Sequence, residues 1–474
     1  MLEEQIGQNF SYDRRMPEKT ALYQAILENV NTVFQNFERD GRDLPSYVRA
    51  EFDKYLDCGI LAKGFLRVRC ACCGHEKAVA FSCKCRGFCP SCGGRRMSEG
   101  AAHLVDNVIP EVPIRQWVLS FPYNLRYLFA YQKKALHQSL QVMLRVINRY
   151  YIQKGEELHG IKGKTGAITL IQRFSGHISL NPHLHVIFLD GIFDENGKFF
   201  RVMPPTDEEV GEVILKIRDR VFRSLTKKGW IEGYDVNFES DELYEESALL
   251  SDIFLASIQN RLYYGKDKGK KAEQVGKFGT GKWVELKGNL CVYKDGFSLH
   301  ANVAIAAYDF KGKERLIRYV LRPSLSKDRL KKREDGNYEY HLKRSWNDGT
   351  ESVKFSGAEL IVRLISLVPP PRMNLIRYFG VLGPNSVLRR KVVKKTERKP
   401  KKKKGRRYIE WAKLLKRVFK IDVTKCSCGG ELKIVSAILD PNAIVPILEN
   451  LKLSTDVPEA FPARAPPEDQ LLLW

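Results

Sequence analysis

Eight of the eleven cysteines in this chain of 474 residues lie between Cys58 and Cys92. In a reducing compartment, such crowding is typical of metal binding rather than of disulfide bridges. Cys70 and Cys73 form one Cys-x2-Cys pair, and Cys89 and Cys92 form another, with fifteen residues between the pairs. Two such pairs can supply four thiolates in the tetrahedral geometry that zinc prefers. The spacing therefore predicts a zinc ribbon in which these four cysteines hold a structural Zn²⁺.

Other residues in the same segment leave the ligand set open. Cys72, Cys83, Cys85 or His75 could replace one ligand, or several of them could hold a second ion. Some of the thiols could instead be buried and free. A structural site fits better than a catalytic one, because a catalytic zinc keeps an open position and usually includes histidine or carboxylate ligands.

A second candidate metal site lies at His183-Leu184-His185. Side chains two residues apart in a strand project from the same face, so both histidines can reach one divalent ion. Two histidines on a strand face are also common as ordinary half-buried side chains. Gln172 and His300, on two other predicted strands, are the candidates for a third ligand. Strand parity places Asp190 on the opposite face.

The segment 314–323 separates into two sides when it is drawn as a helix at about 100° per residue. The apolar side comprises Leu316, Ile317, Val320 and Leu321. The other side comprises Tyr319 and three arginines, Arg315, Arg318 and Arg322. Arginines would favour the phenolate and hold an anionic substrate, while a metal would polarise a phosphoryl oxygen. The alternative, simple packing of Tyr319 at a helix–sheet boundary, is less consistent with its place on the arginine side.

The net charge of +23 implies a polyanionic partner, and nucleic acid is the default. Residues 389–407 contribute 13 basic residues and one glutamate, which is typical of a basic linker or DNA-binding arm. The rest of the chain still carries about +11. No segment approaches the roughly 18 continuous apolar residues of a membrane span, and the first residues lack the order of a secretory signal. We therefore expect no membrane partner and a cytoplasmic, nucleoid-associated location.

The order of predicted elements indicates an α+β fold with an antiparallel sheet carrying helices at about 112–325. Strands are expected near 115–122, 167–174, 183–189 and 297–305, and helices near 124–153 and 207–226. The segment 227–285 reads as irregular. The other expected units are a helical region at 1–57, a zinc-binding domain at 58–100, an extension at 326–388 and a small C-terminal module at 408–474 with a disordered end.

Six segments, taken in this order, resemble transposases of the insertion-sequence-ninety-one type, which belong to the His-hydrophobic-His (HUH) endonuclease superfamily. They are residues 81–93, 115–120, 181–191, 296–301, 318–323 and 377–385. The resemblance runs through about 17–440. It implies a HUH-type nuclease core, with Tyr319 as nucleophile beside Arg318 and Arg322. It also implies that His183 and His185 hold Mg²⁺ or Mn²⁺.

The resemblance further implies rolling-circle-like transposition of DNA, with single-stranded transposon ends and target as partners. Such an enzyme nicks one strand, keeps a 5′-phosphotyrosine link, frees a 3′-OH and later rejoins ends. Some members have two tyrosines four residues apart in this helix, but the flanking positions here are Arg315 and Pro323. A second nucleophile would then have to come from another protomer, as in a dimer on DNA. The C-terminal knuckle also departs from the usual Cys-x2-Cys, since only one residue separates Cys426 from Cys428.

Two alternatives remain open. A plasmid replication initiator or relaxase would use the same chemistry. A non-catalytic, zinc-stabilised DNA-binding regulator would bind DNA without forming a covalent adduct.

Overall fold

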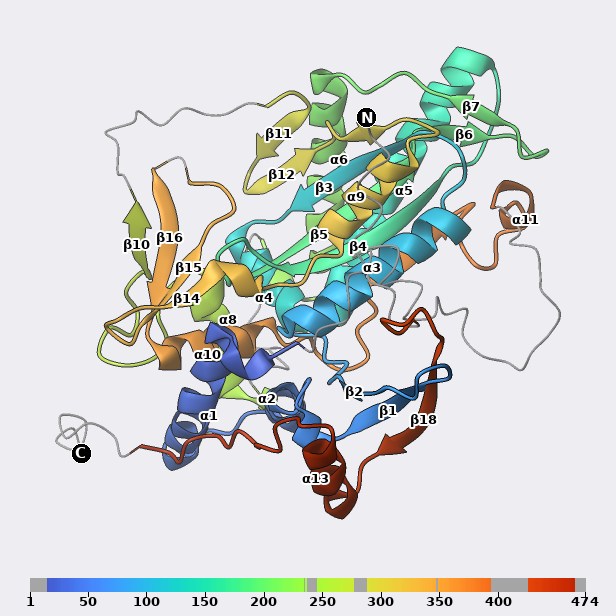
Figure 1. Ribbon diagram of the computed structural model, residues 1–474. Coiled ribbons are helices and arrows are strands. Elements are labelled where there is room, and N and C mark those ends of the chain that lie inside the picture. Colours follow the sequence, from blue (N-terminus) through green and yellow to red (C-terminus); the bar gives the residue numbers. More distant parts are fainter. Residues whose placement is uncertain are drawn as a thin grey trace.

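A seven-stranded antiparallel sheet forms the centre of the molecule, so the predicted α+β class with an antiparallel sheet is confirmed. The computed structural model describes residues 15–233, 235–236, 245–276, 288–346, 348–393 and 425–464. The strands, in spatial order, are β11 (Cys291–Lys294), β12 (Phe297–His300), β3 (Ile114–Ser120), β5 (Leu180–Leu189), β4 (Gly166–Phe174) and β17 (Ile376–Gly380), with β13 (Ala304–Ile305) also paired to β3. The histidine strand β5 therefore lies inside the sheet, between β3 and β4 (Figure 1).

Helices cover both faces of this sheet (Figure 1). One face packs against α4 (Tyr123–Tyr131), α5 (Lys133–His159) and α6 (Asp207–Thr226). The other packs against α3 (Pro90–Asn107) and α9 (Phe310–Val320), which contact each other. Strand alternation sends Trp117 and Leu184 to the first face, and Ile187 and Leu170 to the second. The single helix expected near 124–153 is divided at Gln132, which is the N-cap residue of α5. The Gln132 side chain accepts a hydrogen bond from Lys134 N.

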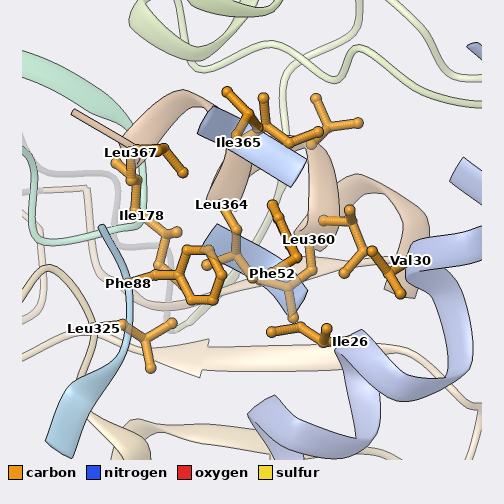
Figure 2. Packing of buried hydrophobic residues seen from close by; sticks show 14 of the residues in the cluster. Ile26, Val30, Phe52, Phe88, Ile178, Leu325, Leu360, Leu364, Ile365 and Leu367 are labelled. Carbon is orange, nitrogen blue, oxygen red and sulfur yellow. The ribbon is translucent and has the colours of Figure 1, made fainter. Parts of the chain in front are cut away.

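A second core joins segments that the sequence suggested were separate. The amphipathic helices α1 (Ala21–Arg39) and α2 (Ser46–Leu56) pack against α8 (Ala248–Ile258) and α10 (Gly357–Leu367). The same core includes a four-stranded sheet of β10 (Glu273–Gly276), β16 (Thr350–Phe355), β15 (Tyr338–His341) and β14 (Leu330–Lys332). Figure 2 shows Ile26, Val30 and Phe52 packed with Leu360 and Leu364 of α10.

This packing changes two of the expected domain boundaries. The region 1–57 and the extension 326–388 share one core, because the apolar faces of α1 and α10 bury each other. The extension also contains β17, which pairs with β4, so the central sheet continues beyond residue 325. The segment 227–285, expected to be irregular, contains α8 and the short hairpin of β8 (Ile231–Glu232) and β9 (Asp235–Val236).

The C-terminal segment packs on the N-terminal zinc region rather than forming its own module. Strand β18 (Leu432–Ile438) pairs with β1 (Phe65–Cys70), which pairs with β2 (Glu76–Ala80), and α13 (Pro441–Asn450) follows β18. Residues 458–464 lie beside α1, where Phe461 N donates to Leu27 O at 2.9 Å. The prediction of a disordered end is therefore wrong for these residues, because α1 offers hydrogen-bond partners.

The smaller elements include the hairpin of β6 (Gly191–Phe193) and β7 (Phe199–Arg201), and the short helix α11 (Arg389–Val392). The rest of the predicted basic arm, 394–407, lies outside the described residues. None of the helices that the structure describes is long and apolar enough to cross a membrane.

Candidate metal and nucleophile site

The two histidines of β5 lie side by side on the sheet face that α9 covers. Their ring centroids are 4.9 Å apart. Across the strands, His183 is opposite both Ser120 and Gln172, and His185 is opposite Val118. The strand geometry thus brings both imidazoles to one place, as the alternation of side chains requires.

The contacts of each ring leave its Nε2 nitrogen available to a metal. His183 Nδ1 lies 2.7 Å from the carbonyl oxygen of Asn181, so Nδ1 carries the proton and donates it. His185 Nδ1 lies 2.7 Å from the Gln116 carboxamide. Metal binding through His185 Nε2 requires a proton on Nδ1. The Nδ1–H group would donate a hydrogen bond to the Gln116 oxygen after the amide rotates by 180°. His185 Nε2 is buried and has no hydrogen-bond partner in the described structure.

Burial keeps both imidazoles neutral, the form that binds metal. Desolvation lowers the pKa of His183 to about 4, although the Asn181 carbonyl acts in the opposite direction. Desolvation, with the charges of His183 and Arg322, lowers the pKa of His185 to about 2. An unpartnered buried nitrogen beside a second neutral imidazole fits a divalent cation, which would satisfy the atom that the protein leaves without a partner.

The two proposed third ligands are placed differently. Gln172 is buried on the strand next to His183, and its Nε2 donates to the carbonyl of Val320 at 3.1 Å. This bond fixes the last residue of α9, while the carboxamide oxygen remains a possible ligand atom. His300 is opposite Val118, which is opposite His185, so two strand spacings, roughly 10 Å, separate the two backbones. Within the described residues, no cluster of three His, Cys, Asp or Glu side chains includes these histidines.

Tyr319 lies in the last turn of α9, next to His185. The two ring centroids are 6.5 Å apart, and the Tyr319 side chain is exposed, with 47% of its surface accessible. The Arg322 guanidinium carbon lies 5.4 Å from the Tyr319 ring centroid, and Lys343 Nζ lies 5.3 Å from it. The helix thus presents the predicted nucleophile to solvent between a metal-competent histidine and two cations.

The arginines beside Tyr319 retain unused hydrogen-bond donors. Arg318 forms an ion pair with Glu314 at 2.5 Å, but its Nε is buried without a partner. The Nε of Arg322 is also buried and unpartnered in the described structure. Burial lowers the pKa of the Arg322 guanidinium, which remains charged at neutral pH. Guanidinium groups with free donors are suited to phosphate oxygens.

Sequence reasoning missed two residues of this site. Gln116 lies on the same sheet face as His185, and a polar side chain at a buried strand position was a usable signal. Lys343 gave no signal, because it lies in the loop after β15 and reaches Tyr319 only through the fold.

Asp190 lies on the other side of the sheet. Its carboxylate accepts two hydrogen bonds from Arg115, at 3.0 and 3.1 Å, and one from the Tyr151 hydroxyl at 3.0 Å. Arg115 also donates to the carbonyl of Ala301 at 2.9 Å. This buried cluster anchors the end of the histidine strand and does not contribute a ligand.

Helix α3 holds the end of α9 through a close glycine contact. A Cβ atom added to Gly93 would lie 2.6 Å from Pro323, just after α9. The Ser324 hydroxyl donates to the carbonyl of Gly87 at 2.9 Å, in the loop before α3. Since α3 begins at the cysteine-rich loop, this loop, α3 and α9 form one packed unit.

The cysteines form two clusters rather than the single four-cysteine ribbon that the spacing predicted. The first cluster comprises Cys58, Cys83, Cys89 and Cys92, and the second comprises Cys70, Cys73, Cys426 and Cys428. The physical reason is the length of the β1–β2 hairpin. Cys70 and Cys73 lie at its tip, about 17 Å along β1 from its base at Phe65, whereas the first cluster lies near the base.

The first cluster has the chemistry of a structural zinc site. Within each cluster, all four sulfurs lie within 4.8 Å of one another. In the first, Cys89 directly precedes α3 and Cys92 lies in its first turn, where the helix dipole favours thiolates. The Arg15 guanidinium lies 3.4 Å from the sulfur of Cys58 and offsets part of the negative charge.

Comparisons with known proteins agree with this arrangement. The family model described as a putative transposase matches residues 166–391, which include both histidines and Tyr319. The model described as a transposase zinc-binding domain matches residues 29–121. A transposase for insertion sequence element IS801 from Pseudomonas savastanoi pv. phaseolicola is 27% identical over 146 residues, which are 30% of this chain and 33% of that protein. This chain therefore matches about a third of the length of that relative. No solved structure matches this chain.

The two models occur in the order that the motifs suggested, and together they include the first cysteine cluster, the histidine strand and the tyrosine helix. These matches confirm the resemblance to transposases of the insertion-sequence-ninety-one type: residues 29–121 match a transposase zinc-binding domain, and residues 166–391 match a transposase model.

Proposed function

We propose that this protein is a metal-dependent DNA strand transferase that cuts and rejoins single-stranded DNA through a phosphotyrosine link to Tyr319. The observation that carries the proposal is the placement of Tyr319, 6.5 Å between ring centroids from a histidine whose buried Nε2 has no partner. The similarity to transposases supports a DNA substrate, and action on DNA would occur in the cytoplasm at the nucleoid.

A divalent ion, Mg²⁺ or Mn²⁺, would polarise the scissile phosphate and be held by His183 and His185, with Gln172 as a further oxygen donor. The two imidazoles leave most coordination positions to water and phosphate oxygens, the arrangement that Mg²⁺ and Mn²⁺ accept. Nitrogen ligands favour Mn²⁺, because Mg²⁺ prefers oxygen.

The remaining work falls to residues of α9 and its surroundings. Arg318 and Arg322 hold the phosphate through their guanidinium groups, and Lys343 adds charge beside the phenol. The Tyr319 oxygen attacks phosphorus and loses its proton to water. The bond from phosphorus to the 3′ oxygen breaks, and the 3′ oxygen takes a proton from water. The reverse steps rejoin DNA, and because the phosphotyrosine keeps the bond energy, no nucleotide cofactor is needed.

A labelled single-stranded oligonucleotide that spans an end of the protein's own element, incubated with protein and Mn²⁺, tests the proposal. We expect a protein–DNA adduct on denaturing gels that EDTA prevents and that Tyr319→Phe abolishes. Tyr308→Phe is the matched control, because Tyr308 is also exposed and lies just before α9. A duplex of the same sequence should give less adduct.

Two outcomes would contradict the proposal. One is an adduct that persists in Tyr319→Phe. The other is wild-type protein that binds the oligonucleotide tightly, in the presence of Mn²⁺, and forms no adduct, which would favour the DNA-binding regulator.

A further inference from the structure

We propose that the second cysteine cluster, Cys70, Cys73, Cys426 and Cys428, binds a zinc ion that fastens the C-terminal segment to the N-terminal zinc region. The matched transposase zinc-binding domain ends at residue 121, and the putative transposase model ends at 391. Half of this ligand set therefore lies outside both matched regions. The inference does not depend on the proposed strand transfer.

The sulfur atoms are spaced for tetrahedral coordination. Zn–S bonds of about 2.3 Å in a tetrahedron place sulfurs about 3.8 Å apart. Cys70 Sγ lies 3.5 Å from Cys428 Sγ, and Cys73 Sγ lies 3.6 Å from Cys426 Sγ. All four sulfurs lie within 4.8 Å of one another, and none is in a disulfide. Four thiolates with no open position are typical of a structural zinc site.

The backbone of each pair is folded into a turn that aims both sulfurs inward. In the first turn, Gly74 N donates to Cys70 O at 3.2 Å, and Gly74 has a φ of +72°. In the second, Gly429 N donates to Cys426 O at 2.9 Å, and Gly429 has a φ of +83°. Each glycine follows the second cysteine of its pair, and its left-handed backbone lets the chain turn directly after the two ligands. Although only one residue separates Cys426 from Cys428, their sulfurs lie within 4.8 Å of each other.

The two turns are held against each other by strand pairing. Cys70 is opposite Leu432 in the β1–β18 register, and Ala71 N donates to Glu431 O at 2.9 Å. The contact is so close at Gly430 that an added Cβ would lie 2.7 Å from Cys70 Sγ and 2.6 Å from Cys72 Cβ. This convergence of both turns on one point is what a shared ion requires.

Besides the pairing of β18 with β1, a small apolar contact holds the C-terminal segment. Ile444 and Leu448 of α13 pack on Leu61, Phe65 and Ala78. By contrast, Ile434 of β18 and the adjoining Leu439 are each 68% exposed. The cysteine pairs are 353 and 358 residues apart in sequence, so one ion would join distant parts of the chain and fix Lys425, where the described chain resumes after residue 393.

Zinc content of the full-length protein, measured by plasma mass spectrometry after gel filtration, tests the site. We expect two zinc ions per chain in the wild type and one in Cys426→Ser/Cys428→Ser. Cys291→Ser, a free cysteine of β11 outside both clusters, should retain two. A single ribbon of Cys70, Cys73, Cys89 and Cys92 would instead leave zinc unchanged when the C-terminal pair is replaced, and that result would overturn the proposal.

Hydrogen exchange tests the fastening role separately. In the Cys426→Ser/Cys428→Ser variant, amides of β18 and of the facing strand β1 should exchange about tenfold faster or more, because their local opening no longer requires loss of the ion. Amides of β5, far from the cluster, should not change. Loss of one zinc with unchanged exchange in β18 would refute the fastening.

Discussion

Asp190→Asn should destabilise the protein strongly although the residue lies outside the reaction site. The Asp190 carboxylate is 1% exposed and pairs with Arg115, whose side chain is 4% exposed. Burial alone would lower the pKa of Arg115, but the hydrogen-bonded ion pair with Asp190 raises it above its ordinary value. The asparagine would leave the buried guanidinium without a counter-charge and would place an amide NH₂ against its donors.

Removing one partner of a buried ion pair costs about 3–5 kcal/mol. The lower end applies here, about 3 kcal/mol, because asparagine keeps one oxygen for Tyr151 and Arg115. For a unit of 150–250 residues this lowers the unfolding midpoint by about 6–12 °C. Differential scanning fluorimetry measures this midpoint directly. The control Glu212→Gln removes an exposed pair with Lys216 and should cost about 0.5 kcal/mol or less.

The double variant Arg115→Met/Asp190→Asn separates this explanation from general damage. The double variant has no uncompensated charge. Its loss of unfolding free energy should therefore be smaller than the sum of the two single losses by at least about 2 kcal/mol. The metal concentration for half-maximal adduct formation should stay unchanged at a temperature where Asp190→Asn is folded. A midpoint within about 2 °C of the wild type, together with a shifted metal requirement, would refute the reasoning and make Asp190 a ligand.

Three further predictions concern the site. Gln116→Leu removes the partner of the buried imidazole and should raise the Mn²⁺ concentration needed for adduct formation about 10- to 100-fold, with the rate at saturating metal largely retained. Lys343→Met should slow adduct formation about tenfold in single-turnover assays, equivalent to about 1.4 kcal/mol, whereas exposed Lys331→Met should not. Gly93→Ala should reduce the adduct rate by displacing the end of α9. Gly94→Ala should leave the adduct rate unchanged, because the space around its Cβ is open. Equal effects of the two changes would exclude the contact with Pro323 as the cause.

Local rules determined much of this protein from sequence. A strand period of two places His183 and His185 on one face, and a helical period of 3.6 places Tyr319 opposite the apolar residues. The structure has both arrangements, with Leu316, Ile317 and Val320 buried while Tyr319 is exposed. The roles of these residues in metal binding and catalysis remain predictions.

Tertiary structure decided which local pieces meet. The spacing identified Cys70 with Cys73 and Cys89 with Cys92 as pairs, because a knuckle is formed by neighbours in the chain. It could not show that a six-residue strand carries the first pair away from the second, toward cysteines more than 350 residues later. The same limit explains Lys343, which lies 24 residues after Tyr319 in sequence and approaches its ring only in the folded chain. Sequence periodicity reports only on neighbours within one helix or strand, whereas ligand partners and charge neighbours are fixed by long-range packing.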